Sequence, residues 1–166
     1  MMWLIILTLF YNMCNVEIIA TNTDRSSYGE TMHPRQVTEC KEITIPMCSY
    51  NNIPYRMTKM PNLLGHTTQQ KAAWEVHQFR PLIAINCSPE LRLFLCSVYF
   101  PKCTTEKELI PPCRSLCNSA KSGCEGIMNK YGHVWPSRLS CQKYSENVNN
   151  CLNSENTSVI LNDTLY

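Results

Sequence analysis

The sequence predicts a mainly helical fold that is stapled by disulfides, and two observations support this prediction. Ten of the eleven cysteines in the 166-residue chain fall in one stretch, and an even number suits a framework of disulfides. Apolar residues in that stretch recur mostly at spacings of three and four, which is the helical period. Such a cysteine density persists in oxidising compartments, so we expect an extracellular or lumenal protein. The ten cysteines are Cys40, Cys48, Cys87, Cys96, Cys103, Cys113, Cys117, Cys124, Cys141 and Cys151.

The N-terminal segment has the features of a secretory signal peptide. Residues 1–20 contain an apolar run from Trp3 to Tyr11, and Ala20 supplies a small residue at a cleavage site. The eleventh cysteine, Cys14, would be removed with this segment. The alternative is an uncleaved membrane anchor, but two asparagines and a glutamate interrupt the run well short of the roughly 20 residues that span a bilayer. We therefore expect secretion, and we expect no lipid anchor because the C-terminal end is polar.

Composition divides the rest of the chain into three parts. Residues 21–39 are polar and predict a flexible lead-in, residues 40–151 predict one domain, and residues 152–166 predict a flexible polar tail. The formal net charge is +2 and the sequence pI is about 8.0. Lysine and arginine are scattered without a basic run, so we expect no nucleic-acid partner.

The first predicted helix begins at a T-x-x-Q capping box formed by Thr67 and Gln70. Its apolar positions follow at helical spacing, and Pro81 should kink or break it because proline lacks an N–H. The stripe consists of Ala72, Ala73, Val76, Phe79 and Ile83.

Start and stop signals define two further helices. One begins at Ser88-Pro89-Glu90, with a cap, a proline and an acid in the first turn. The other opens at Pro112 and ends at Gly132. Residues 43–45 and 55–58 are short β-branched or aromatic runs, which predict brief strands. Together the signals predict about four helices and one or two short strands. The two buried faces are Leu91, Phe94, Leu95 and Val98, and Cys113, Leu116, Cys117, Ala120, Cys124 and Ile127.

Several motifs in the same order give the chain a resemblance to a known family. They are MPNLLGH at 60–66, EVHQF at 75–79, PLIAINCSPELRLFLCSVYFPKC at 81–103, IPPCRSLC at 110–117 and GIMNKYGHVWP at 126–136. The chain closely resembles the cysteine-rich domain of the Frizzled receptors, which binds Wnt. The resemblance covers residues 40–151 and all ten cysteines. It implies the pairs Cys40–Cys103, Cys48–Cys96, Cys87–Cys124, Cys113–Cys151 and Cys117–Cys141, whereas spacing alone leaves the pairing open.

The resemblance also implies two contact regions for Wnt. The first is a groove for the palmitoleoyl chain of Wnt, where each buried methylene contributes about 0.8 kcal/mol. The alternative is that Phe79, Ile85 and Met128 are ordinary core residues. The second region, which grips a loop of Wnt, would use Leu93, Val98 and Tyr99. The groove would use Gln78, Phe79, Pro81, Ile85, Met128, Tyr131 and His133.

Two positions depart from the family pattern. Arg80 stands where many Frizzleds have a large aromatic residue, and His133 stands where phenylalanine is usual. A protonated imidazole would disfavour an acyl chain, so either the groove is reshaped near His133 or a neutral ring lines its mouth.

Three glycosylation sequons begin at Asn86, Asn156 and Asn162. We expect glycans at Asn156 and Asn162. The middle residue of the first sequon is Cys87, whose expected disulfide argues against the use of Asn86.

Catalysis and metal binding find little support. The four histidines lie outside H-E-x-x-H and comparable motifs, and the tightest cysteine spacing is the C-x-x-x-C of residues 113–117. We therefore expect no enzyme, no cofactor and no metal.

The resemblance allows three roles. The chain is a secreted decoy that sequesters acylated Wnt, the ligand-binding part of a Frizzled receptor at the cell surface, or an extracellular module that binds free fatty acid or sterol and no Wnt. A second copy of the domain is a further partner to consider, since two copies could share one lipid.

Overall fold

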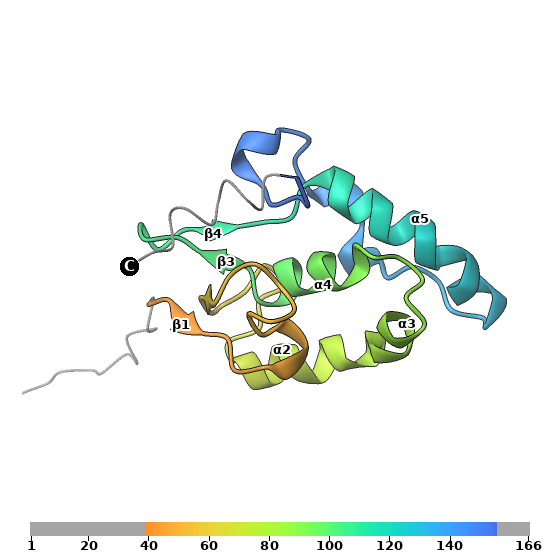
Figure 1. The fold of residues 1–166 in the computed structure, drawn as a ribbon, viewed down its shortest axis with the longest axis horizontal. Coiled ribbons are helices and arrows are strands. Elements are labelled where there is room, and N and C mark those ends of the chain that lie inside the picture. Colours follow the sequence, from red (N-terminus) through yellow and green to blue (C-terminus); the bar gives the residue numbers. More distant parts are fainter. Residues whose placement is uncertain (1–38, 156–166) are drawn as a thin grey trace, which may run out of the picture. The chain divides into compact units, whose positions relative to one another are not determined.

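The computed structural model describes residues 39–155. The predicted signal peptide, nearly all of the predicted lead-in, and the two C-terminal sequons at Asn156 and Asn162 lie outside the described residues. Within the described range the fold is a helical domain with a small sheet at one end (Figure 1). Residues 39–155 contain four α-helices: α2 (Gln69–Val76), α3 (Arg80–Ala84), α4 (Leu91–Tyr99) and α5 (Arg114–Lys130).

Helix α4 forms the centre of the core. It packs against α2 and α5, and also against the 3₁₀ helix η1 (Pro46–Cys48) (Figure 1). The predicted face of Leu91, Phe94, Leu95 and Val98 is fully buried. Each such side chain contributes roughly 1.5–3 kcal/mol by leaving water, so α4 supplies a large share of the stability.

Helix α2 begins one residue later than predicted. Its cap is Thr68, whose side-chain oxygen accepts a hydrogen bond from the backbone N–H of Lys71 at 3.2 Å. The T-x-x-Q pattern placed this cap at Thr67, so that part of the prediction was wrong. Two adjacent threonines offer the same chemistry, and the pattern alone did not separate them.

The predicted break near Pro81 is present. Helix α2 ends at Val76, a 3₁₀ turn η2 (His77–Phe79) follows, and α3 then starts with Pro81 in its first turn. Proline is tolerated there because the first N–H groups of a helix have no partner inside it. Helix α3 follows α2 along the same edge of the domain (Figure 1).

The sheet has four strands of two residues each, in the antiparallel order β1-β2-β3-β4. The sequence predicts one or two strands, and the run 43–45 is instead a loop segment after β1 in which Ile43 and Ile45 are buried and Thr44 is exposed. Strands of two residues have no detectable period, which explains why β3 and β4 were missed. The strands are β1 (Lys41–Glu42), β2 (Met57–Thr58), β3 (Lys102–Cys103) and β4 (Leu109–Ile110).

Five disulfides hold these elements together, and they are the five pairs that the family resemblance implies. They join Cys40 to Cys103, Cys48 to Cys96, Cys87 to Cys124, Cys113 to Cys151 and Cys117 to Cys141.

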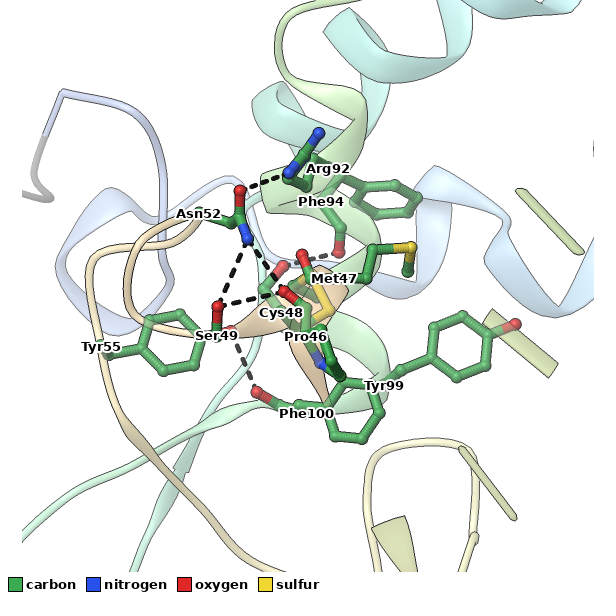
Figure 2. Close-up of a disulfide and its surroundings, with 12 residues drawn as sticks. Pro46, Met47, Cys48, Ser49, Asn52, Tyr55, Arg92, Phe94, Tyr99 and Phe100 are labelled. Atoms are coloured by element: carbon green, nitrogen blue, oxygen red, sulfur yellow. Dashed lines mark hydrogen bonds between the residues drawn. A yellow bond between two sulfur atoms is a disulfide. The ribbon is translucent and has the colours of Figure 1, made fainter. Parts of the chain in front are cut away.

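The Cys48–Cys96 disulfide ties η1 to the middle of α4 (Figure 2). The loop after η1 is held by side chains around it. Asn52 Nδ2 donates to the carbonyl oxygen of Pro46 at 2.9 Å, and Arg92 of α4 donates to Asn52 Oδ1 (Figure 2). Covalent and polar links therefore fix this face of α4 to the loop.

Candidate functional site

The C-terminal end of α5 gathers three of the predicted groove residues. The backbone N–H of His133 donates to the carbonyl oxygen of Met128 at 2.9 Å, and that of Gly132 donates to Asn129 at 3.0 Å. Gly132 has a positive φ of 75°, so this is a Schellman motif that requires glycine at the reversal. Met128 is buried, while Tyr131 is 70% exposed beyond it.

The turn η2 and helix α3 gather the other four residues. Phe79 is buried and its ring centroid lies 6.5 Å from that of Tyr99 in α4. Gln78 and Pro81 are exposed, and Ile85 at the end of α3 is 55% exposed. This group therefore also has a buried aromatic residue beneath exposed side chains.

The core links the two groups. Phe79 and Met128 belong to one buried hydrophobic cluster, so each group rests on the packing around α4. The burial of these two residues agrees with the alternative that they are ordinary core residues. Ile85 and Tyr131 are different, because large apolar side chains left in water often mark a binding surface.

The two most exposed large apolar side chains in residues 39–155 were not predicted from the sequence. Trp74 is 82% exposed and Val134 is 77% exposed. A signal for Trp74 existed, because it falls off the stripe of Ala72, Ala73 and Val76 on α2. Val134 lies in the loop after the helix stop, where periodicity carries no information.

Two of the three residues predicted for the second contact region have buried side chains in this structure. Val98 and Tyr99 are fully buried, so neither side chain is available to a partner. Both lie in α4, which is covered by neighbouring elements on several sides. Leu93 is half-buried and packs against the edge of the core.

His66 of the MPNLLGH motif belongs to a polar network. Its Nε2 lies 2.6 Å from Oε2 of Glu75 in α2, and the other carboxylate oxygen of Glu75 pairs with Arg138. Asn62 accepts the backbone N–H groups of Leu64 and His66 on its side-chain oxygen. The motif therefore joins α2 to the segment after α5, which is a structural role.

Burial raises the pKa of two tyrosines in the core, Tyr99 and Tyr144. Burial raises the pKa of Tyr99 to about 12, and the neighbouring Arg138 guanidinium only partly opposes the shift. Burial also raises the pKa of Tyr144 to about 12. Both hydroxyls stay protonated at neutral pH, so they do not act as bases there.

A cavity of 640 Å³ lies apart from the predicted groove. Its walls come from β1, β2, the MPN segment and the start of α2, and include Lys41, Glu42 and Gln69. It shares no residue with the predicted groove. Most of the residues that line it are polar or charged.

The described residues give no support for a metal centre or a membrane span. No group of three or more His, Cys, Asp or Glu side chains in residues 39–155 is arranged to hold a metal ion. No helix in that range is both long enough and apolar enough to cross a bilayer.

The structure therefore defines a small helical domain, stapled by disulfides, with apolar side chains exposed above a packed core. The chain belongs to the Fz domain family, whose model matches residues 40–148. Frizzled-1 from Xenopus laevis is 55% identical over 108 residues, which is 65% of this chain and 19% of that relative. The chain thus spans about a fifth of this relative's length. The resemblance to Frizzled is confirmed.

A crystal structure of the Smoothened CRD also matches. The match has a TM-score of 0.47 and 27% identity, and it covers 70% of this chain and 94% of that chain.

Proposed function

We propose that this chain is an extracellular Wnt-binding domain that takes the acyl chain of Wnt along the apolar surface formed by α3 and the end of α5. Membership of the Fz domain family supports the extracellular role, as do the five disulfides. The role is one of binding, with no catalytic step.

One observation carries the proposal: exposed and buried apolar residues alternate at both ends of the surface. In this proposal the buried Phe79 and Met128 form the floor, and the exposed Ile85 and Tyr131 contact the acyl chain from the solvent side. An acyl chain laid over such a surface removes apolar area from water on both partners. At about 0.8 kcal/mol per methylene, a long acyl chain contributes several kcal/mol to the free energy of binding.

The two departures from the family pattern fit at the edge of this surface. His133 and Arg80 are both exposed. The backbone N–H of His133 donates to the carbonyl oxygen of Met128, and the side chain is exposed, so the ring can line the mouth without entering the floor. Of the second contact region, Leu93 alone remains as a candidate.

The test measures binding of the secreted chain to acylated Wnt and to Wnt whose lipid-bearing serine is replaced. Binding should need the acyl group. Ile85→Asp should weaken it at least tenfold, because a carboxylate would lose its hydration beneath the chain. Phe79 and Met128 are unsuitable for substitution, since a charge there would unfold the domain.

The matched control is Val148→Asp, at a site of similar exposure (51%) in the 3₁₀ helix η5 (Val148–Asn150). This variant should bind like the unaltered chain. Equal affinity for both forms of Wnt would refute the acyl surface. Failure to bind either form would refute Wnt as the ligand, and direct titration with a free fatty acid would then test the lipid-module role.

A further inference from the structure

Asn86 lies in an exposed turn between α3 and α4. Its backbone has φ 51°, and its N–H donates to the carbonyl oxygen of Ile83 at 3.1 Å. The side chain is exposed and makes no hydrogen bond to another residue in the range 39–155. A group attached to its amide nitrogen therefore displaces no core contact.

The other two residues of the Asn86-Cys87-Ser88 sequon are fixed in the folded domain, because Cys87 is disulfide-bonded and Ser88 is buried. Ser88 is 7% exposed, and its hydroxyl donates to the carbonyl oxygen of Ser119 at 3.2 Å. The same oxygen accepts the backbone N–H of Glu90 at 3.3 Å. The hydroxyl therefore uses its donor on α5 and accepts a hydrogen bond from the start of α4.

Helix α5 lies directly on this part of the sequon. A Cβ added to Gly123 would stand 2.6 Å from the carbonyl oxygen of Cys87 and 2.8 Å from Cβ of Ser88. The neighbouring disulfide joins Cys87 to Cys124, with Cα atoms 5.0 Å apart. No enzyme can reach the Ser88 hydroxyl until α5 is displaced.

We propose that Asn86 is N-glycosylated in the secretory pathway before the Cys87–Cys124 disulfide closes. Transfer needs the Asn amide and the hydroxyl two residues later; the amide is exposed in the folded domain, but the hydroxyl is accessible only before α5 docks. Nδ2 of Asn86 attacks the anomeric carbon of a lipid-diphosphate-linked oligosaccharide. The bond from that carbon to the diphosphate oxygen breaks, the lipid diphosphate leaves with the electron pair, and Nδ2 releases one proton.

The order of synthesis provides time for this reaction. The disulfide partners are separated by 37 residues along the chain. At about 5–20 residues per second, roughly 2–7 s pass between the synthesis of Cys87 and that of Cys124. During this interval Cys87 has no native partner, so the sequon remains open.

The glycan would stand one residue from Ile85, at the rim of the proposed acyl-binding surface. Its place there makes it a steric limit on how a large partner approaches α3. The modification requires only passage through the secretory pathway and does not depend on Wnt binding. The two proposals can therefore fail separately.

A structural explanation for asparagine at this position must be separated from the modification. Asparagine tolerates positive φ better than most residues, which alone could account for its presence. Asn86→Asp is the matched variant, because aspartate has nearly the same shape and tolerance of positive φ but lacks the acceptor amide. Ser88→Ala is a second variant that keeps Asn86 and removes the required hydroxyl.

The experiment expresses the whole chain with Asn156→Gln and Asn162→Gln in a secretory host, so that no other N-x-S/T sequon remains. Lysate and medium are treated with an amidase that removes N-glycans. We expect a shift in mobility by one glycan, lost in both Asn86→Asp and Ser88→Ala. No shift in either fraction overturns the proposal, even if the chain still binds Wnt. Because the lysate is included, a variant that fails to fold is still scored.

A second measurement tests the order of events. Brief treatment of the cells with a thiol reductant keeps Cys87 unpaired, and the glycosylated fraction should rise. A fraction that is unchanged by the reductant would show that disulfide closure does not limit the modification, contrary to the proposal.

Discussion

Helices α3 and α4 follow each other in the chain, yet they differ sharply in how far their residues are buried. In α4, seven of the nine residues are buried, including Leu91, Phe94 and Leu95. In α3, none of the five residues is buried, although all but Arg80 are apolar. The turn between them is tied to α5 by the Cys87–Cys124 disulfide.

The comparison shows that hydrophobicity alone does not decide where a helix lies. Helix α4 has neighbours in α2, α5 and η1, so its apolar residues are covered. Helix α3 begins after the break near Pro81, and its apolar residues Leu82 and Ile83 are only partly buried against the core. The core thus provides the stability that allows α3 to keep an apolar surface exposed.

Removing a large side chain from α4 should have the largest effect. Phe94 is fully buried, with ring centroids 5.9 Å from Trp135 and 5.7 Å from Tyr144. Phe94→Ala should lower the free energy of unfolding by about 3–5 kcal/mol, because it leaves a cavity between these rings. Denaturant unfolding with the disulfides intact measures the loss. If Phe94→Ala lowered the free energy of unfolding by no more than Ile83→Ala in α3 does, the contrast between the two helices would be contradicted.

Breaking the polar network on α2 should have an intermediate effect. Glu75→Gln removes the charge that pairs with His66 and Arg138 at a mostly buried site, so we expect a loss of about 1–3 kcal/mol. The matched control is Glu125→Gln, which removes an exposed pair with Lys121 on α5. The control should cost about 0.5 kcal/mol or less. Equal losses in urea unfolding would rule out a special role for Glu75.

Raising the pH should weaken the core gradually. The pKa of Tyr99 and of Tyr144 is raised to about 12 in the folded state, against about 10 in the unfolded chain. Between these values the unfolded chain has released its protons and the folded domain has not. Stability is therefore fully present below pH 10 and falls as the pH rises, by roughly 1 kcal/mol per pH unit for each tyrosine. Denaturant midpoints from pH 9 to 12 test this, and a flat profile would contradict it.

A polar substitution on the exposed surface should have the smallest effect on stability. Ile85→Asp should change the free energy of unfolding by no more than about 0.5 kcal/mol, because the side chain is already 55% exposed. Thermal unfolding measures this. A larger loss would mean that Ile85 belongs to the core, and any effect on Wnt binding would then have a structural cause.

The sequence predicted the features that depend on strong local signals. The buried face of α4, the interruption at Pro81 and the stop at Gly132 follow from periodicity and from the special geometry of proline and glycine. The cysteine pairing needed the family resemblance, since spacing leaves many pairings possible. The β3–β4 hairpin was missed because strands of two residues have no period.

The site was harder to predict than the fold. Whether Val98 and Tyr99 face a partner or the core depends on η1, α2 and α5, which come from distant parts of the chain. The same holds for Ser88, whose hydroxyl is closed by α5. Exposure arises from packing between remote segments, and a local pattern does not contain that information.

The placement of two disulfides has a mechanical consequence. Cys40 is bonded to Cys103, and Cys113 is bonded to Cys151. A force that pulls on both boundaries of the domain would therefore pass through these bonds and the short β3–β4 hairpin between them (Figure 1). Helices α2, α3, α4 and α5 lie inside closed covalent loops and bear no tension. A ligand under load could thus be held without stretching the helices beneath it.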